Sequence, residues 1–416
     1  MANIISYSNG MRVIVENIPF LRSVCAGIWV KTGSAVESDK NNGISHFVEH
    51  VMFKGTSKMS ALEIANAFES RGAIVNAFTS KENTCYFYKC VDNDNEFCFS
   101  KLCEILKDSI FDAKELDSER KVIEEEINMV DDAPEDICYD VLAAALYGNH
   151  SYARTILGPK ENVDKFDKRD VLKYMDEQYT AGSIVVAIAG NVTIEQADEL
   201  VRRYLGGLKD KPQKSVIGDV EYKPVTKTFI KDFKQANLML AYPSISITDD
   251  GNEIQSLLSI IMGGCMGSRL FQQIREKKGL AYSVYSSPAR RVNSGSFNIA
   301  LNINSANTLG ALNATIDEIN KIVDSGVTED ELMAAKAQLR ASIVFGQENM
   351  QSVMLSLGKN LSLADDVFDI DEIVSKINAA TKQQVDDFAK RLFSAKPALA
   401  YVGSDSGVDF DKILGR

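Results

Sequence analysis

The chain has 416 residues, of which 45% are hydrophobic and 25% are charged, and these proportions are typical of a globular protein. This length exceeds what one ordinary core requires and predicts two domains of about 200 residues each. The net charge of −12 argues against nucleic-acid binding, and no apolar run reaches the roughly 18 residues that span a membrane.

The N-terminal residues predict a β-hairpin and not a secretory signal. Ile4–Ser8 and Met11–Glu16 have the length of short strands, and Asn9-Gly10 between them favours a tight turn. A secretory signal would need a basic leader and an unbroken apolar run, and the segment has neither. The seven cysteines include no CxxC pair, so we expect reduced thiols in a cytoplasmic compartment, not a disulfide framework.

Helical and alternating patterns follow one another through the first half of the chain. The predicted strands are Val24–Lys31, Ala73–Thr79, Thr84–Val91 and Ser183–Ala189. The predicted helices are Ile44–Met52, Ala61–Arg71, Glu96–Ile110, Ala113–Val130, one after Pro134 and one that ends near Leu205. Gly148–Ala153 is expected to be a loop.

Residues 206–224 combine Gly, Pro and charge without periodicity, which is typical of a linker. After them the pattern begins again. Strands are predicted at Asn237–Tyr242, Tyr282–Ser287, Gly295–Asn302 and Ala398–Gly403, with helices on both sides of Gly263-Gly264 and through about 307–393. The chain is therefore divided into an N-terminal domain (1–210), a linker (211–225) and a C-terminal domain (226–416).

The two halves resemble each other, since SIVVAIAGN (183–191) near the end of the first parallels PALAYVGSD (397–405) near the end of the second. This similarity indicates an internal duplication. The expected fold is of the α+β class, with two related domains that are each a mainly antiparallel sheet covered by helices.

Two of the three histidines, His46 and His50, stand four residues apart in the segment GISHFVEHVMFKGT (43–56). Residues i and i+4 lie on one face of a helix, so both imidazoles can bind one cation. Glu49 projects about 60° away from His46 around the helix, close enough to reach a water on that metal. Both histidines could be satisfied core residues instead, but this spacing with an adjacent acid favours a metal site.

A catalytic zinc site needs a third protein ligand and an open position. In DSERKVIEEEINMV (117–130), Glu119 and Glu126 fall on the apolar stripe of the predicted helix, whereas Glu124 and Glu125 do not. A carboxylate that faces a core needs a compensating partner. Glu126 is therefore the candidate metal ligand and Glu119 the acid that holds a histidine N–H. A salt bridge to Arg or Lys is the alternative for each.

HFVEH (46–50), with SERKVIEEEI (118–127) further along the chain, closely resembles the inverted zinc-motif peptidases of the pitrilysin family. The similarity is greatest to half-length bacterial members and to the catalytic subunit of mitochondrial processing peptidase. The resemblance implies that His46, His50 and Glu126 bind one Zn²⁺ per chain, that Glu49 is the catalytic base and that Glu119 supports the site. It also implies a zinc endopeptidase that cleaves short or unfolded polypeptides.

The same resemblance suggests where a peptide substrate binds. In GAIVNAFTSKENTCYF (72–87), family members hold substrate as an added strand, which implies pairing with Val75, Asn76, Ala77 and Phe78. An ordinary hairpin is the alternative. In the second half, Arg275 and Tyr282 match an Arg and a Tyr that contact the substrate backbone or the oxyanion. Without the family, Arg275 would be a solvated helix residue and Tyr282 a packing residue of a strand.

Full-length relatives enclose substrate with four such domains, and this chain supplies two. The resemblance thus implies a homodimer or a complex with a zinc-less sister subunit, although a monomer that closes like a clamp would also serve. A non-catalytic scaffold or assembly subunit of the same fold is the alternative function. A zinc sensor would need a fourth protein ligand, and no further His or Cys has suitable spacing.

Overall fold

The computed structural model describes residues 2–210, 217–367 and 369–415, which form two compact units. The first comprises Met1–Ile127, Arg154–Ile217 and Phe345–Phe368, and the second comprises Asn128–Ala153, Gly218–Val344 and Asp369–Arg416. Each half of the sequence thus contributes one segment to the other unit, whereas the predicted domains follow chain order. Of the predicted linker, residues 217–225 form no helix or strand, and 211–216 lie outside the described residues.

The first unit is built on a six-stranded sheet with the order β1-β2-β6-β3-β5-β4. Its strands are β1 (Asn3–Ser6), β2 (Arg12–Asn17), β3 (Ser23–Val30), β4 (Ile74–Thr79), β5 (Thr84–Val91) and β6 (Ile184–Gly190). β2 and β6 are parallel, and every other neighbouring pair is antiparallel. The predicted N-terminal hairpin is confirmed by the pairing of β1 with β2.

The second unit contains a five-stranded sheet with the order β7-β11-β8-β10-β9. Its strands are β7 (Thr226–Ile230), β8 (Ala236–Ser244), β9 (Ala281–Arg290), β10 (Gly295–Ile303) and β11 (Ala398–Gly403). Only β7 and β11 are parallel. Strands β2 to β6 of the first sheet and β7 to β11 of the second therefore have the same order and directions, which is the topology that a duplication predicts.

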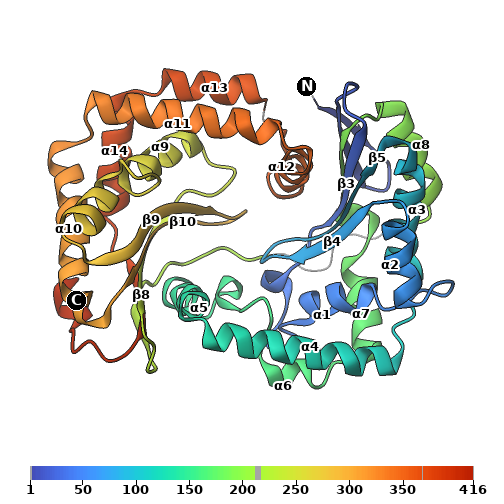
Figure 1. The fold of residues 1–416 in the computed structure, drawn as a ribbon, viewed down its shortest axis with the longest axis horizontal. Helices are drawn as coiled ribbons and strands as arrows, with labels where there is room; N and C mark the ends of the chain where they lie inside the picture. Colours follow the sequence, from blue (N-terminus) through green and yellow to red (C-terminus); the bar gives the residue numbers. More distant parts are fainter. Residues whose placement is uncertain (1, 211–216, 368, 416) are drawn as a thin grey trace. The chain divides into compact units, whose positions relative to one another are not determined.

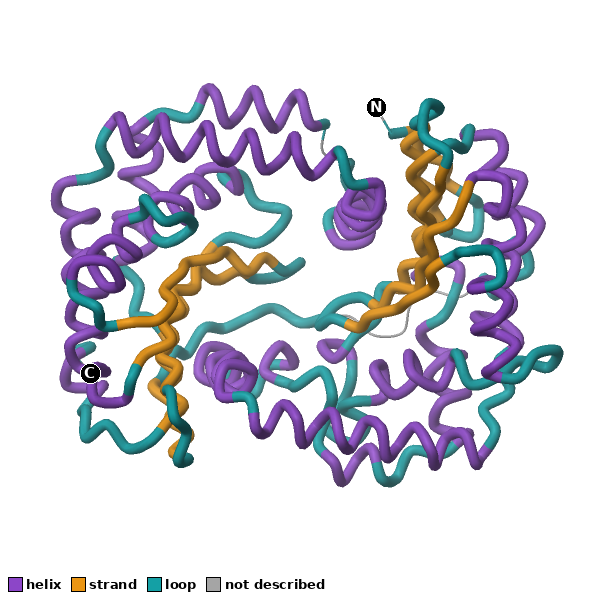
Figure 2. Tube along the Cα trace, viewed as in Figure 1, coloured by secondary structure: helices purple, strands orange, loops and turns teal. Residues whose placement is uncertain are grey.

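Helices make up most of the remaining chain (Figures 1 and 2). In the first half they are α1 (Ile44–Met52), α2 (Ala61–Glu69), α3 (Asn95–Asp108), α4 (Ala113–Asp132), α5 (Pro134–Tyr147), α6 (Lys160–Val163), α7 (Lys168–Gln178) and α8 (Ile194–Leu205). In the second they are α9 (Asn252–Met262), α10 (Thr308–Ser325), α11 (Glu329–Gln347), α12 (Met350–Leu363), α13 (Ile370–Ala379), α14 (Lys382–Phe393) and α15 (Phe410–Ile413). None of the described helices combines the length and apolarity that a membrane crossing requires.

Alternate residues of the strands in the first sheet serve two separate cores, because successive side chains point to opposite faces. Val24, Ala26 and Ile28 of β3 pack with the helices of the N-terminal half, including α1 and α3. Cys25 and Trp29 face the other way and pack against Met350, Val353 and Met354 of α12. A helix from the C-terminal half thus completes this unit (Figure 1).

The exchanged helices occupy equivalent places in the two units. α12 packs on β6, β3 and β2, and α5 packs on β11, β8 and β7, which are the matching strands of the second sheet. The contact of α12 with the sheet is close, because a Cβ added to Gly358 would lie 2.0 Å from Nε1 of Trp29. Glycine at this position lets the helix backbone approach the indole ring.

Candidate metal centre

The buried carboxylate of Glu37 holds the first residues of α1, the helix that carries the two histidines. Gly43 precedes α1 with φ of 102°, a conformation that glycine adopts at little cost. Glu37 is only 3% exposed, and its carboxylate accepts hydrogen bonds from the backbone N–H groups of Gly43 and Ser45 and from the Ser45 hydroxyl. These bonds satisfy N–H groups that would otherwise lack partners at the helix start, and they hold α1 in place.

His46, His50 and Glu126 meet between α1 and α4 of the first unit. Oε2 of Glu126 lies 3.6 Å from Nε2 of His46 and 3.5 Å from Nε2 of His50. Two ligand atoms bound about 2.1 Å from one ion at a tetrahedral angle lie about 3.4 Å apart, so these separations fit zinc. In the described part of the chain, these three side chains are the one group of three or more His, Cys, Asp or Glu close enough to hold a metal ion.

Glu119 lies nearly two turns before Glu126 along α4 and contacts the Nδ1 side of the His50 ring. Its Oε2 is 3.1 Å from Nδ1 of His50, and its Oε1 is 2.6 Å from Nζ of Lys54. The carboxylate can thus hold His50 with Nε2 directed toward Glu126, as outer partners of metal-bound histidines commonly do. The proposed histidine contact and the alternative salt bridge are both present. Lys54 went unnoticed in the sequence, although it follows His50 by four residues.

The surroundings of the two imidazoles shift their pKa values in opposite directions. Burial and the neighbouring His50 lower the pKa of His46 to about 3, so this ring is neutral and able to bind a cation at neutral pH. Burial acts to lower the pKa of His50, but its hydrogen bond with Glu119 and the charges of Glu126 and Glu49 outweigh burial and raise it. The site is therefore acidic enough to attract a positive charge, which a divalent metal would supply in place of a proton.

Glu49 lies on α1 between the two histidines, and burial raises the pKa of its carboxyl group. Its Oε2 accepts a hydrogen bond of 2.5 Å from the hydroxyl of Thr79, the last residue of β4. A half-buried carboxylate with a raised pKa beside a metal site suits a general base. Nothing in the sequence spacing of Thr79 and Glu49 indicated this contact.

The residues expected to hold substrate lie on β4, which forms one edge of the six-stranded sheet of described strands. Val75, Ala77 and Phe78 are half-buried, and Asn76 is exposed. The backbone N–H of Ala77 donates to Oδ1 of Asn76 at 2.8 Å, so a side chain of the strand itself occupies this donor. β4 therefore has the position of an edge strand that another chain could extend.

Arg275 and Tyr282 belong to the second unit, whereas His46, His50 and Glu126 belong to the first. Arg275 lies in a π-helical segment, η5 (Phe271–Lys277), where its guanidinium carbon is 4.8 Å from the centre of the Phe271 ring. Tyr282 lies on β9, an edge strand, and is 67% exposed. It does not pack within the sheet as the simpler interpretation of this tyrosine expected.

The third histidine has a structural environment. Nε2 of His150 lies 3.1 Å from the carbonyl oxygen of Gly218, and its Nδ1 accepts a hydrogen bond from the backbone N–H of Tyr152. Both ring nitrogens of His150 thus contact backbone atoms of the second unit.

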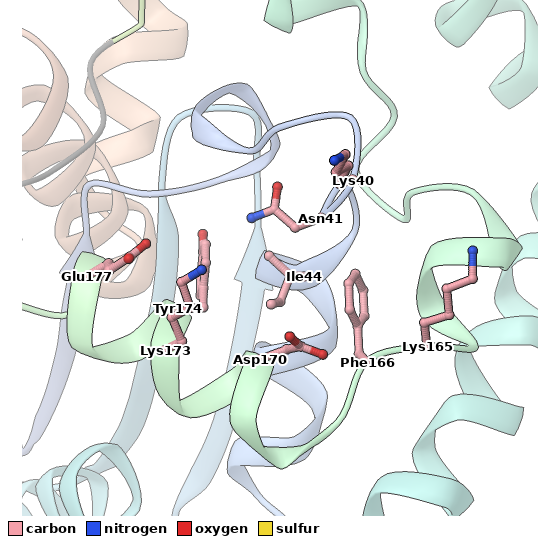
Figure 3. Close-up of a pocket in the computed structure, with 9 residues that line it drawn as sticks. All are labelled: Lys40, Asn41, Ile44, Lys165, Phe166, Asp170, Lys173, Tyr174 and Glu177. Carbon is pink, nitrogen blue, oxygen red and sulfur yellow. The ribbon is translucent and has the colours of Figure 1, made fainter.

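A cavity of about 160 Å³ lies beside the first turn of α1 (Figure 3). Its lining residues come from the loop before α1, from α1 and from the region of α7, and they are Lys40, Asn41, Ile44, Lys165, Phe166, Asp170, Lys173, Tyr174 and Glu177. His46, His50 and Glu126 are not among the residues that line this cavity. Tyr174 of α7, which lines the cavity, also contacts α1, because its hydroxyl lies 2.6 Å from Oγ of Ser45.

Comparison with known proteins places these features in a family. Residues 12–160 match the model of insulinase (peptidase family M16), and residues 165–339 match the peptidase M16 inactive domain. An uncharacterized zinc protease of Bacillus subtilis is 39% identical over 400 residues, covering 96% of this chain and 97% of its own. Another uncharacterized zinc protease, from Streptomyces coelicolor, is 32% identical and covers 95% of this chain and 88% of its own.

Solved structures share the fold at lower identity. A crystal structure described as a peptidase M16 inactive domain from Pseudomonas fluorescens superimposes with a TM-score of 0.91 at 21% identity, over 97% of this chain and 98% of its own. The structure of a protease from Helicobacter pylori gives a TM-score of 0.89 at 20% identity, over 97% of this chain and 99% of its own. These likenesses show the fold alone and not the activity.

Proposed function

Because the chain belongs to peptidase family M16, we propose that it is a zinc-dependent endopeptidase that hydrolyses peptide bonds of short or unfolded polypeptides. The observation that carries the proposal is the position of Glu126, whose carboxylate lies 3.6 and 3.5 Å from the Nε2 atoms of His46 and His50. Glu49 lies on the same helix as both imidazoles, so a base and three ligands are available at one place.

His46, His50 and Glu126 would hold the zinc ion, which when bound lowers the pKa of a water toward ~7 and polarises the peptide carbonyl. Glu49 would take a proton from the attacking water on its carboxylate and then deliver it to the leaving amine. Glu119, whose Oε2 lies 3.1 Å from Nδ1 of His50, would keep this ring oriented so that Nε2 could bind the ion.

We further propose that substrate adds to β4 along Val75–Phe78 and that Arg275 and Tyr282 contact its backbone or the oxyanion. Substrate pairing would displace the Asn76 side chain from the Ala77 N–H, a donor that a peptide carbonyl could then use. Backbone pairing gives register with little side-chain selectivity, which suits unfolded chains.

For assembly we propose a homodimer or pairing with a zinc-less sister subunit, because the chain supplies two related domains where longer relatives have four. The mass of the native protein in solution tests this. We also propose a cytoplasmic location, since all seven cysteines are present as free thiols.

The direct test is incubation of the purified protein with a peptide mixture, with and without a metal chelator, followed by mass spectrometry of the products. We expect cleavage that the chelator abolishes and added zinc restores. Glu49→Gln protein should retain zinc but cleave at least about 100-fold more slowly, because a general base is lost. Absence of both cleavage and bound metal from native protein would instead support a non-catalytic scaffold subunit.

A further inference from the structure

Thr79 occupies the point where the edge strand meets the metal centre. It is the last residue of β4, and its Oγ1 lies 2.5 Å from Oε2 of Glu49 on α1. Among the described residues, Thr79 is the one that donates a hydrogen bond to the Glu49 carboxylate. The side chains of Val75, Asn76, Ala77 and Phe78 make no such contact with Glu49, so β4 reaches the proposed base through one hydroxyl.

The direction of this hydrogen bond follows from the neighbouring groups. An ionised carboxylate can only accept, so Thr79 donates its single hydroxyl proton to Glu49. The Thr84 hydroxyl lies 3.5 Å away from Oγ1 of Thr79 and donates to the carbonyl oxygen of Thr32 at 3.0 Å. Thr84 therefore does not compete for the Glu49 oxygen, and its own bond to the backbone helps to fix the end of the hairpin.

The position of the Thr79 hydroxyl is also restricted. Threonine is branched at Cβ, which restricts its χ1 rotation, and Thr79 pairs with Thr84 in the β-ladder. With Oε2 bound to Thr79, rotation of the Glu49 carboxylate is restrained, and Oε1 would be held in one orientation to take the proton of the attacking water. Geometry of this kind is what proton transfer requires, since a displacement of about 1 Å at a reacting group costs on the order of 100-fold in rate.

We propose that Thr79 is a positioning residue for Glu49, holding its carboxylate through Oε2 from the same strand that is proposed to receive substrate. The inference rests on the proposed peptidase function and extends it. It assigns to the end of β4 a role in orienting the base, separate from backbone pairing with the peptide.

Two substitutions separate the hydroxyl from the shape of the side chain. Thr79→Val keeps the branched shape and removes the donor, whereas Thr79→Ser keeps the donor. We expect Thr79→Val to lower kcat roughly 10- to 100-fold, the loss that follows removal of a hydrogen bond to a charged group. KM should change less than about 3-fold because the backbone edge is intact, and Thr79→Ser should recover most of kcat. Zinc affinity, measured by chelator competition, and the melting temperature should match the wild type.

A binding measurement tests the same contact without turnover. Acetohydroxamic acid chelates zinc and gives its hydroxyl proton to a carboxylate beside the metal, so its affinity for the zinc-loaded protein depends on the orientation of Glu49. Thr79→Val should bind it about 10-fold more weakly and Thr79→Ser about as well as the wild type.

The outcomes are distinct. Unchanged kcat and unchanged hydroxamate affinity in Thr79→Val would overturn the positioning role. The role would also be overturned if Thr79→Val bound zinc more weakly, or melted at a lower temperature, to an extent that accounts for the fall in activity. If zinc-loaded wild-type protein cleaves no peptide, the peptidase proposal fails, and the hydroxamate comparison still decides whether Thr79 orients Glu49.

Discussion

The ammonium nitrogen of Lys54 lies 2.6 Å from Oε1 of Glu119. The other oxygen of this carboxylate lies 3.1 Å from Nδ1 of His50, so one buried acid connects a lysine just beyond α1 with a candidate metal ligand within it. The hydrogen bonds with His50 and Lys54 outweigh burial and lower the pKa of Glu119, which keeps it ionised. An ionised Glu119 can accept the N–H of His50, which leaves the opposite ring nitrogen free for zinc.

We expect Lys54→Met to weaken zinc binding up to about 10-fold. Without the lysine, one oxygen of a nearly buried carboxylate loses its partner, and protonation or rotation of Glu119 would disturb its bond to His50. Chelator competition on the metal-free protein measures the change, and Lys54→Arg, which retains the charge, should recover most of the affinity. Equal zinc affinity in Lys54→Met and wild type would contradict this.

Replacement of Glu126 by Gln should reduce zinc affinity more than the roughly 10- to 100-fold loss that removal of an outer partner produces, because a ligand itself is lost. Glu125→Gln is the matched control, since Glu125 is the adjacent residue of α4 and is exposed. Isothermal titration of both variants with zinc checks the prediction. A similar loss in the two variants would mean that general acidity, and not one carboxylate, binds the metal.

Zinc should also stabilise the folded protein. A ligand that binds only the native state at 100 times its dissociation constant contributes about 2.7 kcal/mol, so the melting temperature should rise on zinc addition and fall on chelation. Calorimetry of the chelated and reloaded protein measures this. The His46→Asn variant, which lacks one ligand, should show a much smaller rise. A rise of equal size in that variant would place zinc elsewhere on the chain.

Much of the fold could be predicted because strong local patterns coincide with the elements. The helix Ile44–Met52 and the strands Thr84–Val91 and Ala398–Gly403 are observed with the predicted bounds. The stretch between Ala153 and Ser183 received no prediction, yet it contains α6 and α7, and β7 was also missed. α7 is a short helix in which six of the eleven residues are charged, and Val171 and Tyr174 are its only buried apolar residues, so few apolar positions mark its inner face.

The candidate metal-binding group could be predicted because helical periodicity brings His46 and His50 together and places Glu126 on the apolar face of its helix. In the same segment the apolar residue Val122 is 45% exposed, so apolar periodicity identified the buried face of α4 only approximately. Lys54 and Thr79 were not recognised, since their roles depend on contacts across 65 and 30 residues of sequence. The exchange of α5 and α12 between the units is likewise a tertiary feature, and neither helix carries a sequence signal for its partner sheet.

The docking of α12 yields a stability prediction that is independent of the metal. Gly358→Ala places a Cβ 2.0 Å from Nε1 of the buried Trp29, so helix and sheet must separate. We expect a loss of about 1–3 kcal/mol, the usual effect of overpacking, although alanine intrinsically favours a helix by about 1 kcal/mol. In Gly346→Ala, on α11, the added methyl meets nothing within 4 Å, so only the helical preference acts and stability should be unchanged or higher. Urea unfolding of both variants measures the difference in their free energies of unfolding.

Equal stability of the two variants would mean that α12 can shift on the sheet without cost. Contacts other than the packing on Trp29 would then hold α12 in the first unit.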